Sequence, residues 1–277
     1  MTTTNKKNIS NKIVLIRGGG DLASGIAHRF FTFGFPVIIL ELPKPLAIRR
    51  LVSFSEAVYE REWTVESVAS RLMVEPETMP DIQWPFIPII VDPDSRSITK
   101  LHPAIIVDAR MTKQNPGTKI NDVPLIIGLG PGFTAGKDVH FVIETQRGDS
   151  LGKIIDNGTA LPDTGIPGEL GGESLRRVIR AQASGIFTSN LTIGTKISSG
   201  DIIGYVNGTP VTSAISGILR GLLRNGLYVP QKTKIADVDP RHNIDVHSIS
   251  DKSNLIAKSV LKLVSYTLKN IAIYHCI

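Results

Sequence analysis

A strand, a glycine-rich turn and a helix follow one another near the start of this chain, and this order constrains the fold more than any other feature. Residues 13–16 (IVLI) form a continuous apolar run, which predicts a strand buried on both faces of a parallel sheet. Three glycines follow, and apolar residues then recur at helical spacing up to Gly34 and Pro36. A second apolar run at 37–40 completes a strand–helix–strand unit, so we expect an α/β fold around a parallel sheet.

The glycine turn fits the spacing G-x-G-x-x-[GA], which is typical of dinucleotide-binding loops. In that pattern the first glycine permits a tight turn, the second lets a pyrophosphate approach the backbone, and the small third residue lets the helix pack on the strand. Free amides at the helix start then face the anion. An acid ends the second predicted strand, where a ribose hydroxyl would bind. The residues predicted to bind the ligand are Gly18, Gly19, Gly20, Asp21, Leu22, Ala23 and Glu41.

Two features of this segment leave the ligand open. Asp21 lies at the helix N-terminus, where it stabilises the helix dipole but repels an approaching phosphate. Arg49 and Arg50 follow Glu41 closely enough to accommodate a phosphorylated ribose. A turn that is purely structural is the alternative interpretation of the glycine pattern.

Further apolar runs predict a sheet of about six strands. Each run contains β-branched residues and ends in a polar residue or a glycine, as a strand does when its carboxyl end opens onto a crevice. Helices are expected at 63–73 and 173–182, where apolar residues recur three and four apart. The additional strands are expected at 86–92, 104–110, 124–130 and 140–146.

A second group of candidate ligand-binding residues follows two of these runs. Asp108 and Arg110 end one run, and Gly128, Gly130 and Gly132 form a turn after another. All five are expected at the same carboxyl edge of the sheet. The backbone amides of the second turn would form an anion nest, although a turn that needs unusual φ angles would have the same composition. The acid and the base would equally well pair with one another.

Changes in composition divide the chain into five parts. A polar tail at 1–11 precedes a Rossmann-like nucleotide-binding domain at 12–150. Residues 151–183 are expected to form a loop rich in Gly, Pro, Asp and Thr, with a connecting helix. Short β-type runs between glycine turns predict a smaller β-rich, barrel-sandwich-like domain at 184–245. The segment 246–277 is predicted to be a C-terminal helix and tail.

Charge and composition argue against several classes of partner. The formal net charge is +6, but the basic residues lie singly or in pairs, so we expect no nucleic-acid binding. The longest largely apolar stretch, 30–42, contains Gly and Pro and is too short to cross a bilayer, so we expect no membrane association. The single cysteine, Cys276, and the polar N-terminus predict a cytoplasmic protein.

The sequence contains no conventional catalytic constellation. The six histidines lack metal-ligand spacing, and neither a G-x-S-x-G elbow nor a Walker sequence is present. We therefore predict no metal site, whereas the catalytic residues stay unknown, and whether the protein is an enzyme stays open.

Several strings of the chain resemble one family, the YqeB-type selenium-dependent molybdenum hydroxylase accessory proteins. The N-terminal unit is also similar to the Rossmann domain of xanthine dehydrogenase accessory proteins, and the β-rich segment resembles lipoyl and biotinyl carrier half-barrels. The turn at 207–210 lacks the lysine that carrier domains modify, which favours a docking surface over a swinging arm. The strings that carry the family resemblance are IRGGGDLASGIAHR, ELPKPLAIRRLVSFSEAVYE, VDARM, GLGPGFTAGKDVHFVIETQRG, DTG-PG and KIADVDPR.

This resemblance implies a function in the maturation of a molybdenum hydroxylase. The expected partner is the hydroxylase apoenzyme, and the expected cofactor is a dinucleotide-type ligand, either a molybdopterin dinucleotide or NAD(P). Because the glycine turn suits either one, an NAD(P)-dependent oxidoreductase is the first alternative function. A non-catalytic assembly scaffold is the second.

Overall fold

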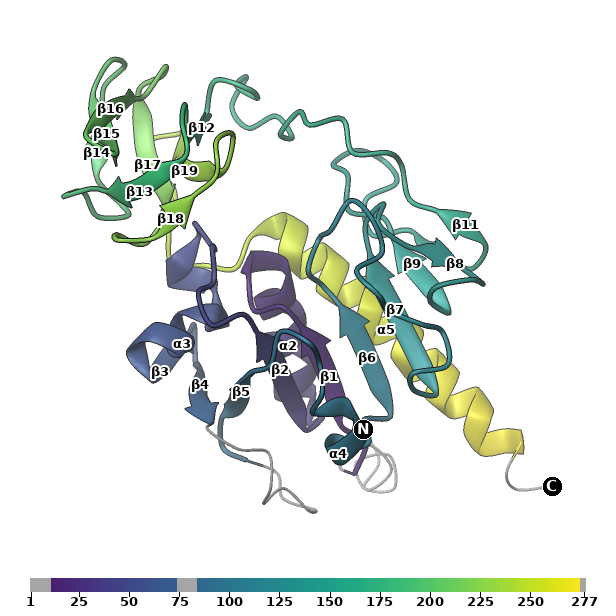
Figure 1. The fold of residues 1–277 in the computed structure, drawn as a ribbon. Helices are drawn as coiled ribbons and strands as arrows, with labels where there is room; N and C mark the ends of the chain where they lie inside the picture. Colours follow the sequence, from purple (N-terminus) through teal and green to yellow (C-terminus); the bar gives the residue numbers. More distant parts are fainter. Residues whose placement is uncertain (1–10, 74–83, 275–277) are drawn as a thin grey trace. The chain divides into compact units, whose positions relative to one another are not determined.

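The computed structural model describes residues 11–73 and 84–274 of the chain (Figure 1). The chain divides into two compact units, each assembled from segments that are separated in the sequence. Unit 1 consists of Met1–Pro43, Phe54–Asp163 and Ile249–Ile277. Unit 2 consists of Lys44–Ser53 and Thr164–Ser248.

Unit 1 is built on a nine-stranded sheet with the strand order β10-β9-β7-β6-β1-β2-β5-β4-β3. The seven inner strands run parallel, whereas β3 and β10 pair antiparallel at the two edges. Two further short strands, β8 (Thr134–Ala135) and β11 (Gly158–Thr159), pair with each other. The strands of the large sheet are β1 (Val14–Arg17), β2 (Val37–Glu41), β3 (Glu62–Val65), β4 (Val68–Met73), β5 (Ile87–Val91), β6 (Ile105–Asp108), β7 (Leu125–Leu129), β9 (Phe141–Ile143) and β10 (Ile154–Ile155).

Two helices pack side by side on one face of this sheet, α2 (Asp21–Phe33) and α5 (Asp251–Tyr274) (Figure 1). The helix α2 ends at Gly34, which adopts a left-handed conformation (φ 104°) and donates its amide to two carbonyls of the last turn. The two helices approach closely at Gly25, where a side chain would overlap with the Ser253 hydroxyl. That hydroxyl instead donates to the main-chain oxygen of Asp21 at 3.0 Å, which ties the start of α2 to α5.

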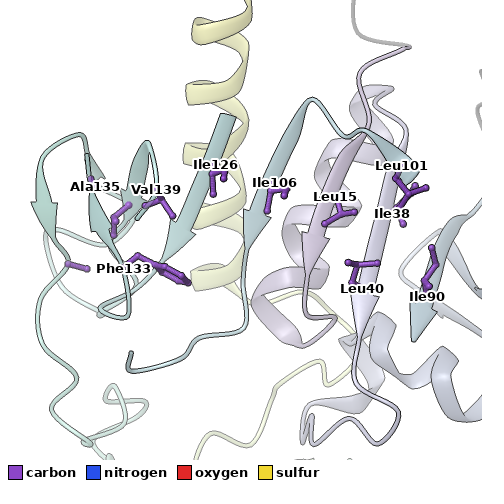
Figure 2. Close-up of a cluster of buried hydrophobic side chains, with 12 residues drawn as sticks. Leu15, Ile38, Leu40, Ile90, Leu101, Ile106, Ile126, Phe133, Ala135 and Val139 are labelled. Atoms are coloured by element: carbon purple, nitrogen blue, oxygen red, sulfur yellow. The ribbon is translucent and has the colours of Figure 1, made fainter. Parts of the chain in front are cut away.

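A cluster of buried apolar side chains covers the other face of the sheet (Figure 2). Leu15, Ile38, Ile106 and Ile126 come from four neighbouring strands and point to the same side, because they occupy matching register positions. The segments that pack against this cluster are short, such as α4 (Ile98–Leu101). Within the described ranges, helices longer than four residues therefore lie on one face of the sheet only.

The remaining helical elements of the described chain are single turns after β2. They are η1 (Arg50–Val52), η2 (Phe54–Glu56) and α3 (Ala57–Glu60). In the part of the chain that the structure describes, no helix combines the length and the apolar character that crossing a bilayer requires.

Unit 2 consists of two four-stranded antiparallel sheets, ordered β12-β19-β17-β14 and β16-β15-β13-β18. Inward-facing apolar side chains such as Phe187, Leu219 and Val238 are fully buried. Buried ion pairs join its strands and loops: Arg177 pairs with Asp237 and also donates to the Gly168 oxygen. The strands are β12 (Val178–Arg180), β13 (Gly185–Thr188), β14 (Lys196–Ile197), β15 (Ile202–Val206), β16 (Thr209–Thr212), β17 (Gly217–Leu222), β18 (Tyr228–Val229) and β19 (Lys234–Asp239).

The predicted fold class, a Rossmann-like parallel sheet beside a lipoyl-type barrel-sandwich domain, is wrong. The large sheet is mixed, with antiparallel strands at both edges, and unit 2 adds two further antiparallel sheets. A doubly wound sheet carries helices on both faces, whereas this sheet has long helices on one. The physical reason is that the connections on the other face contain at most one helical turn, so loops and the cluster of Figure 2 cover that face.

Two predicted helices are strands in the structure. Residues 63–73 belong to the β3–β4 hairpin, in which Val65 pairs with Val68 and Glu66 takes the left-handed turn position (φ 51°). Within each strand the apolar residues alternate with a period of two. The turn between the strands interrupts this alternation, so that apolar residues of the two strands together lie three and four positions apart, as they do in a helix. Within 173–182, residues Val178–Arg180 form β12.

Candidate functional site

The candidate site lies at the carboxyl ends of β1 and β6. These neighbouring strands mark the point in the sheet from which the later strands continue in opposite directions. From β1 the chain continues through α2 to β2 on one side, while β6 lies on the other side of β1. In open sheets with parallel strands, ligands bind at this kind of reversal point. The glycine turn follows β1, and Asp108 is the last residue of β6.

Each of the three glycines of the first turn has a different environment. Gly18 has a left-handed φ of 92°, and a side chain built on it would lie 3.5 Å from the Arg110 Cα. A side chain on Gly19 would meet the Ser55 amide nitrogen at 2.9 Å. At Gly20, no described atom lies within 4 Å of the position that a Cβ would take. The turn is therefore closely packed at its first two glycines and open at the third.

Glu41 contacts the glycine turn directly. Its Oε2 accepts a hydrogen bond from the Gly19 amide at 2.6 Å, and its Oε1 accepts one from the Leu42 amide at 2.7 Å. Burial raises the pKa of the Glu41 carboxyl above its usual range, and the two amide hydrogen bonds offset part of that effect. Each carboxylate oxygen still has acceptor capacity for a further donor.

Two serines that the sequence analysis missed hold the turn in place. The Ser24 hydroxyl donates to the Gly19 oxygen at 2.9 Å and accepts from the Phe54 amide at 2.8 Å. The Ser55 amide donates to the same Gly19 oxygen at 2.9 Å. No motif signals these serines, because their function depends on the return of segment 54–56 to the turn.

The other predicted residues of the first turn lie at the start of α2. The Asp21 main-chain oxygen accepts the hydrogen bond from Ser253 described above. Ala23 is buried within α2, and Leu22 is partly buried.

Asp108 is the centre of a buried polar cluster on the face of the sheet opposite α2. The Arg110 guanidinium donates to both carboxylate oxygens, from Nε to Oδ1 at 3.0 Å and from Nη2 to Oδ2 at 2.5 Å. The Thr118 hydroxyl donates to Oδ2 at 2.6 Å. Arg17, the register partner of Asp108 in β1, brings its Nη1 to 3.5 Å from Oδ2. The pair between the acid and Arg110 is one that the sequence predicts, whereas no motif signals Arg17 or Thr118.

The electrostatics of this cluster favour an ionised Asp108. Burial raises the pKa of the Asp108 carboxyl, but the hydrogen bonds and charge of Arg110, the Thr118 hydroxyl and the charge of Arg17 more than offset it and hold the pKa below its usual range. Burial lowers the pKa of the Arg17 guanidinium. Arg17 also lies 3.7 Å from Asp122, a second carboxylate.

The second glycine turn is shaped by packing at all three of its predicted positions. Gly128 lies next to Asp108 in the strand register, and the Phe133 ring occupies the space of its missing side chain. Gly130 has a left-handed φ of 77° and lies against Thr145, whose Oγ1 would be 2.9 Å from an added Cβ. At Gly132 the main-chain oxygen of residue 112 leaves no space for a side chain. Anion binding by this turn stays a prediction.

Metal binding finds no support in the side chains that are described. Within residues 11–73 and 84–274, no group of three or more His, Cys, Asp or Glu side chains is arranged to hold a metal ion. The histidine that lies beside strand β7 is used structurally: the His140 Nδ1 accepts from the Ile126 amide at 3.0 Å, and burial lowers its pKa.

The chain is similar to a curated protein over most of its length. No protein-family model matches the chain. Over 254 residues the chain is 46% identical to the uncharacterized protein YqeB of Escherichia coli (strain K12), a match that covers 91% of this chain and 47% of YqeB. The chain thus spans about half the length of this relative.

Three solved structures align with most of the chain at low similarity. An aspartoacylase family protein from Mesorhizobium loti is 12% identical, with 82% of this chain and 85% of that chain covered and a TM-score of 0.28. A succinylglutamate desuccinylase/aspartoacylase from Rhodobacter sphaeroides is 13% identical, with coverage of 85% and 87% and a TM-score of 0.28. The product-bound ectoine utilization protein EutE (DoeB) from Ruegeria pomeroyi is 12% identical, with coverage of 83% and 85% and a TM-score of 0.29.

The predicted function, a maturation factor for a selenium-dependent molybdenum hydroxylase, is contradicted by these comparisons. The aligned structures are named for aspartoacylase, desuccinylase and ectoine utilization, and not for molybdenum enzyme maturation. The two alternatives, an NAD(P)-dependent oxidoreductase and an assembly scaffold, belong to the same prediction and are not proposed. The family resemblance and the hydroxylase partner stay predictions, because the curated relative is named only as uncharacterized.

Proposed function

We propose that unit 1 binds a small ligand with neighbouring hydroxyl groups, such as a ribose or another sugar, at the carboxyl ends of β1, β2 and β6. The observation that carries this proposal is the Glu41 carboxylate, which two backbone amides hold against the glycine turn. An ionised carboxylate only accepts hydrogen bonds, and each of its oxygens has acceptor capacity for one more donor. Vicinal hydroxyls would supply two such donors in the matching geometry.

The rigidity of the turn supports binding at this position. Glu41 is fixed at both oxygens, and Ser24 and Ser55 both donate to the Gly19 oxygen. A carboxylate whose position is already fixed loses little conformational freedom when a ligand binds. In the same turn, no described atom lies within 4 Å of the position that a Cβ on Gly20 would take.

The same geometry makes a diphosphate a poorer ligand for this turn than the glycine spacing alone implies. The amide of Gly19, which lies between the first two glycines of the motif, already donates to Glu41 and is not free for an anion. The carboxylate also places a negative charge beside the turn, and like charges repel. The dinucleotide-type ligand predicted from the sequence contains ribose, so it belongs to the class of ligands with neighbouring hydroxyl groups, and it stays a prediction.

Titration calorimetry with paired ligands tests the proposal. Ribose 5-phosphate, AMP and NAD would each be compared with an analogue that lacks the vicinal hydroxyls, such as 2′,3′-dideoxy-AMP for AMP. We expect at least one diol to bind wild-type protein about tenfold or more tightly than its deoxy analogue, because a hydrogen bond to a charged acceptor contributes about 1.5–3 kcal/mol. The E41Q variant should lose that preference.

E62Q is the matched control for E41Q. Glu62 is an exposed glutamate of the edge strand β3, where it pairs with Arg71. Its substitution should leave the preference for the diol unchanged. The proposal is refuted if no diol binds wild-type protein, or if E41Q and E62Q retain the preference equally.

A further inference from the structure

We propose that Arg110 is an anion-binding side chain that exchanges partners: on ligand binding it leaves Asp108 for a phosphate or carboxylate of the ligand, and Arg17 takes its place on Asp108. This inference rests on the proposed site and specifies its ligand further, as a molecule with an anionic group near its hydroxyls. The observation behind it is that two guanidinium groups surround one buried carboxylate, and that Arg110 makes a two-pronged contact with it whereas Arg17 makes only a long one.

Asp108 has more cationic neighbours than it needs in the observed state. Its side chain is 0% exposed, so it requires a permanent counter-charge. The two-pronged contact with Arg110 supplies that charge in the strongest geometry available to a carboxylate. A second arginine, Arg17, lies at the limit of hydrogen-bond distance, 3.5 Å away.

Arg17 has unused capacity to bind Asp108. Its side chain is only 7% exposed, and burying a guanidinium is costly. Among the described residues its Nε is buried without a hydrogen-bond partner. Its Nη1 donates to the Thr118 hydroxyl at 2.6 Å, next to the Asp108 carboxylate. A small movement toward Asp108 would therefore complete the pair without any change in the strand.

Arg110 is the arginine that is placed to leave. Its side chain is 25% exposed, more than that of Arg17, and it belongs to the loop after β6. Its Cα lies 3.5 Å from the position of a Cβ on Gly18, so the residue adjoins the glycine turn. The preceding residue stays anchored, because the Ala109 amide donates to the Arg17 oxygen at 3.0 Å. Only the Arg110 side chain has to rotate.

The exchange keeps every buried charge paired. Without Arg17, the departure of Arg110 would leave Asp108 as an isolated buried charge, which is the unfavourable case for a buried pair. With Arg17 in place, Asp108 keeps both a guanidinium and the Thr118 hydroxyl. A phosphate or carboxylate offers Arg110 the same two-pronged geometry that Asp108 gave it.

Ligand pairs that differ only in the anionic group test the exchange. Calorimetry would compare AMP with adenosine, and ribose 5-phosphate with ribose, on wild-type protein and on R110Q, R110K, R17K and R96Q. We expect R110Q to lower AMP affinity at least tenfold more than adenosine affinity, because it removes a charge-assisted hydrogen bond to the phosphate. R110K should recover part of the loss. R17K should also weaken AMP binding selectively, because lysine cannot reproduce the two-pronged pair with Asp108.

R96Q is the control, because Arg96 is an exposed arginine that pairs with Asp94 on the surface. Urea unfolding of each variant shows whether it is folded, and R110K provides the test if R110Q does not fold. In addition, NMR of the arginine Nε–H groups should show the Arg17 signal change on AMP binding to wild-type protein. An unchanged Arg17 signal in the AMP complex overturns the exchange.

The outcomes separate this inference from the proposed function. If R110Q weakens AMP and adenosine equally while E41Q abolishes the preference for a diol, the exchange is wrong and the hydroxyl site stands. If AMP binding depends on Arg110 but not on Glu41, and the Arg17 signal changes in the complex, the exchange stands and the hydroxyl site is wrong. If no ligand binds, inorganic phosphate is the remaining probe, and an equal effect of phosphate on the melting temperatures of wild type and R110Q overturns the exchange.

Discussion

The close contact between α2 and α5 predicts that Gly25→Ala destabilises unit 1, although alanine is the better helix former. The added Cβ would overlap with the Ser253 hydroxyl and would lie 3.1 Å from the Ser253 Cβ and 3.2 Å from the Ile249 Cγ2. Both helices are held to the sheet, so the hydroxyl has to move. That movement breaks its hydrogen bond to the Asp21 oxygen.

The magnitude follows from three opposing contributions. Replacing glycine by alanine inside a helix contributes about 1 kcal/mol of stability. Overpacking costs about 1–3 kcal/mol, and the lost hydrogen bond costs about 1 kcal/mol. Gly25→Ala should therefore lower the free energy of unfolding by about 1–3 kcal/mol. In a Ser253→Gly background the obstacle is absent, and the same substitution should become neutral or stabilising by up to about 1 kcal/mol.

Urea unfolding followed by tryptophan fluorescence measures this double-mutant cycle. The chain contains two tryptophans, Trp63 and Trp84, and both belong to unit 1, so the signal reports on the unit that contains α2 and α5. The reversal of sign between the two backgrounds is the decisive result. Equal destabilisation by Gly25→Ala in both backgrounds would refute the role assigned to the Ser253 contact.

Three further predictions follow from the packing and the buried charges. Phe133→Ala should lower the free energy of unfolding of unit 1 by about 3–5 kcal/mol, measured by urea unfolding, because the ring is fully buried and fills the space beside Gly128. The pKa of Asp108 is lowered in the folded state, so its ionisation stabilises the protein above about pH 4 and this contribution is lost as the pH falls through the lowered pKa. Asp108→Asn should accordingly be less stable than wild type at neutral pH, and the difference should shrink in acid urea titrations. The pKa of Asp239 is also lowered, because the hydrogen bonds and charge of Arg241 outweigh the effect of burial, which raises it. The hydrogen-exchange protection factors of β17 and β19, which correct for the intrinsic rate at each pH, should therefore fall in acid for wild type and change less for Asp239→Asn.

The first strand, turn, helix and second strand could be predicted from the sequence, because each depends on local patterns. Continuous apolar runs identified the strands that became β1 and β2, and Gly34 marked the end of α2. The expected helix at 63–73 failed for a local reason as well. A left-handed residue, Glu66, reverses the chain there, and no simple composition rule assigns that conformation to a glutamate.

The placement of helices on one face of the sheet, and most of the candidate site, depend on contacts between segments that are distant in the sequence. Arg17 was visible in the sequence as the end of a strand, but its pairing with Asp108 depends on the register of two strands far apart in the chain. Thr118 reaches the same carboxylate from a loop without any motif. The periodicity of a strand does not state which face a helix will cover, so the one-sided arrangement of helices could not be predicted.

The position of α5 in the chain has a consequence for biosynthesis. The hydrogen bond from Ser253 to Asp21 joins residues 232 positions apart, and α5 packs along α2. The side of α2 that packs against α5 therefore stays exposed until the α5 segment has left the ribosome, after both segments of unit 2 have been made. Until then Gly25 and the start of α2 lack the partner that Ser253 provides in the folded protein, so unit 1 completes its packing only after the unit 2 segments have been made.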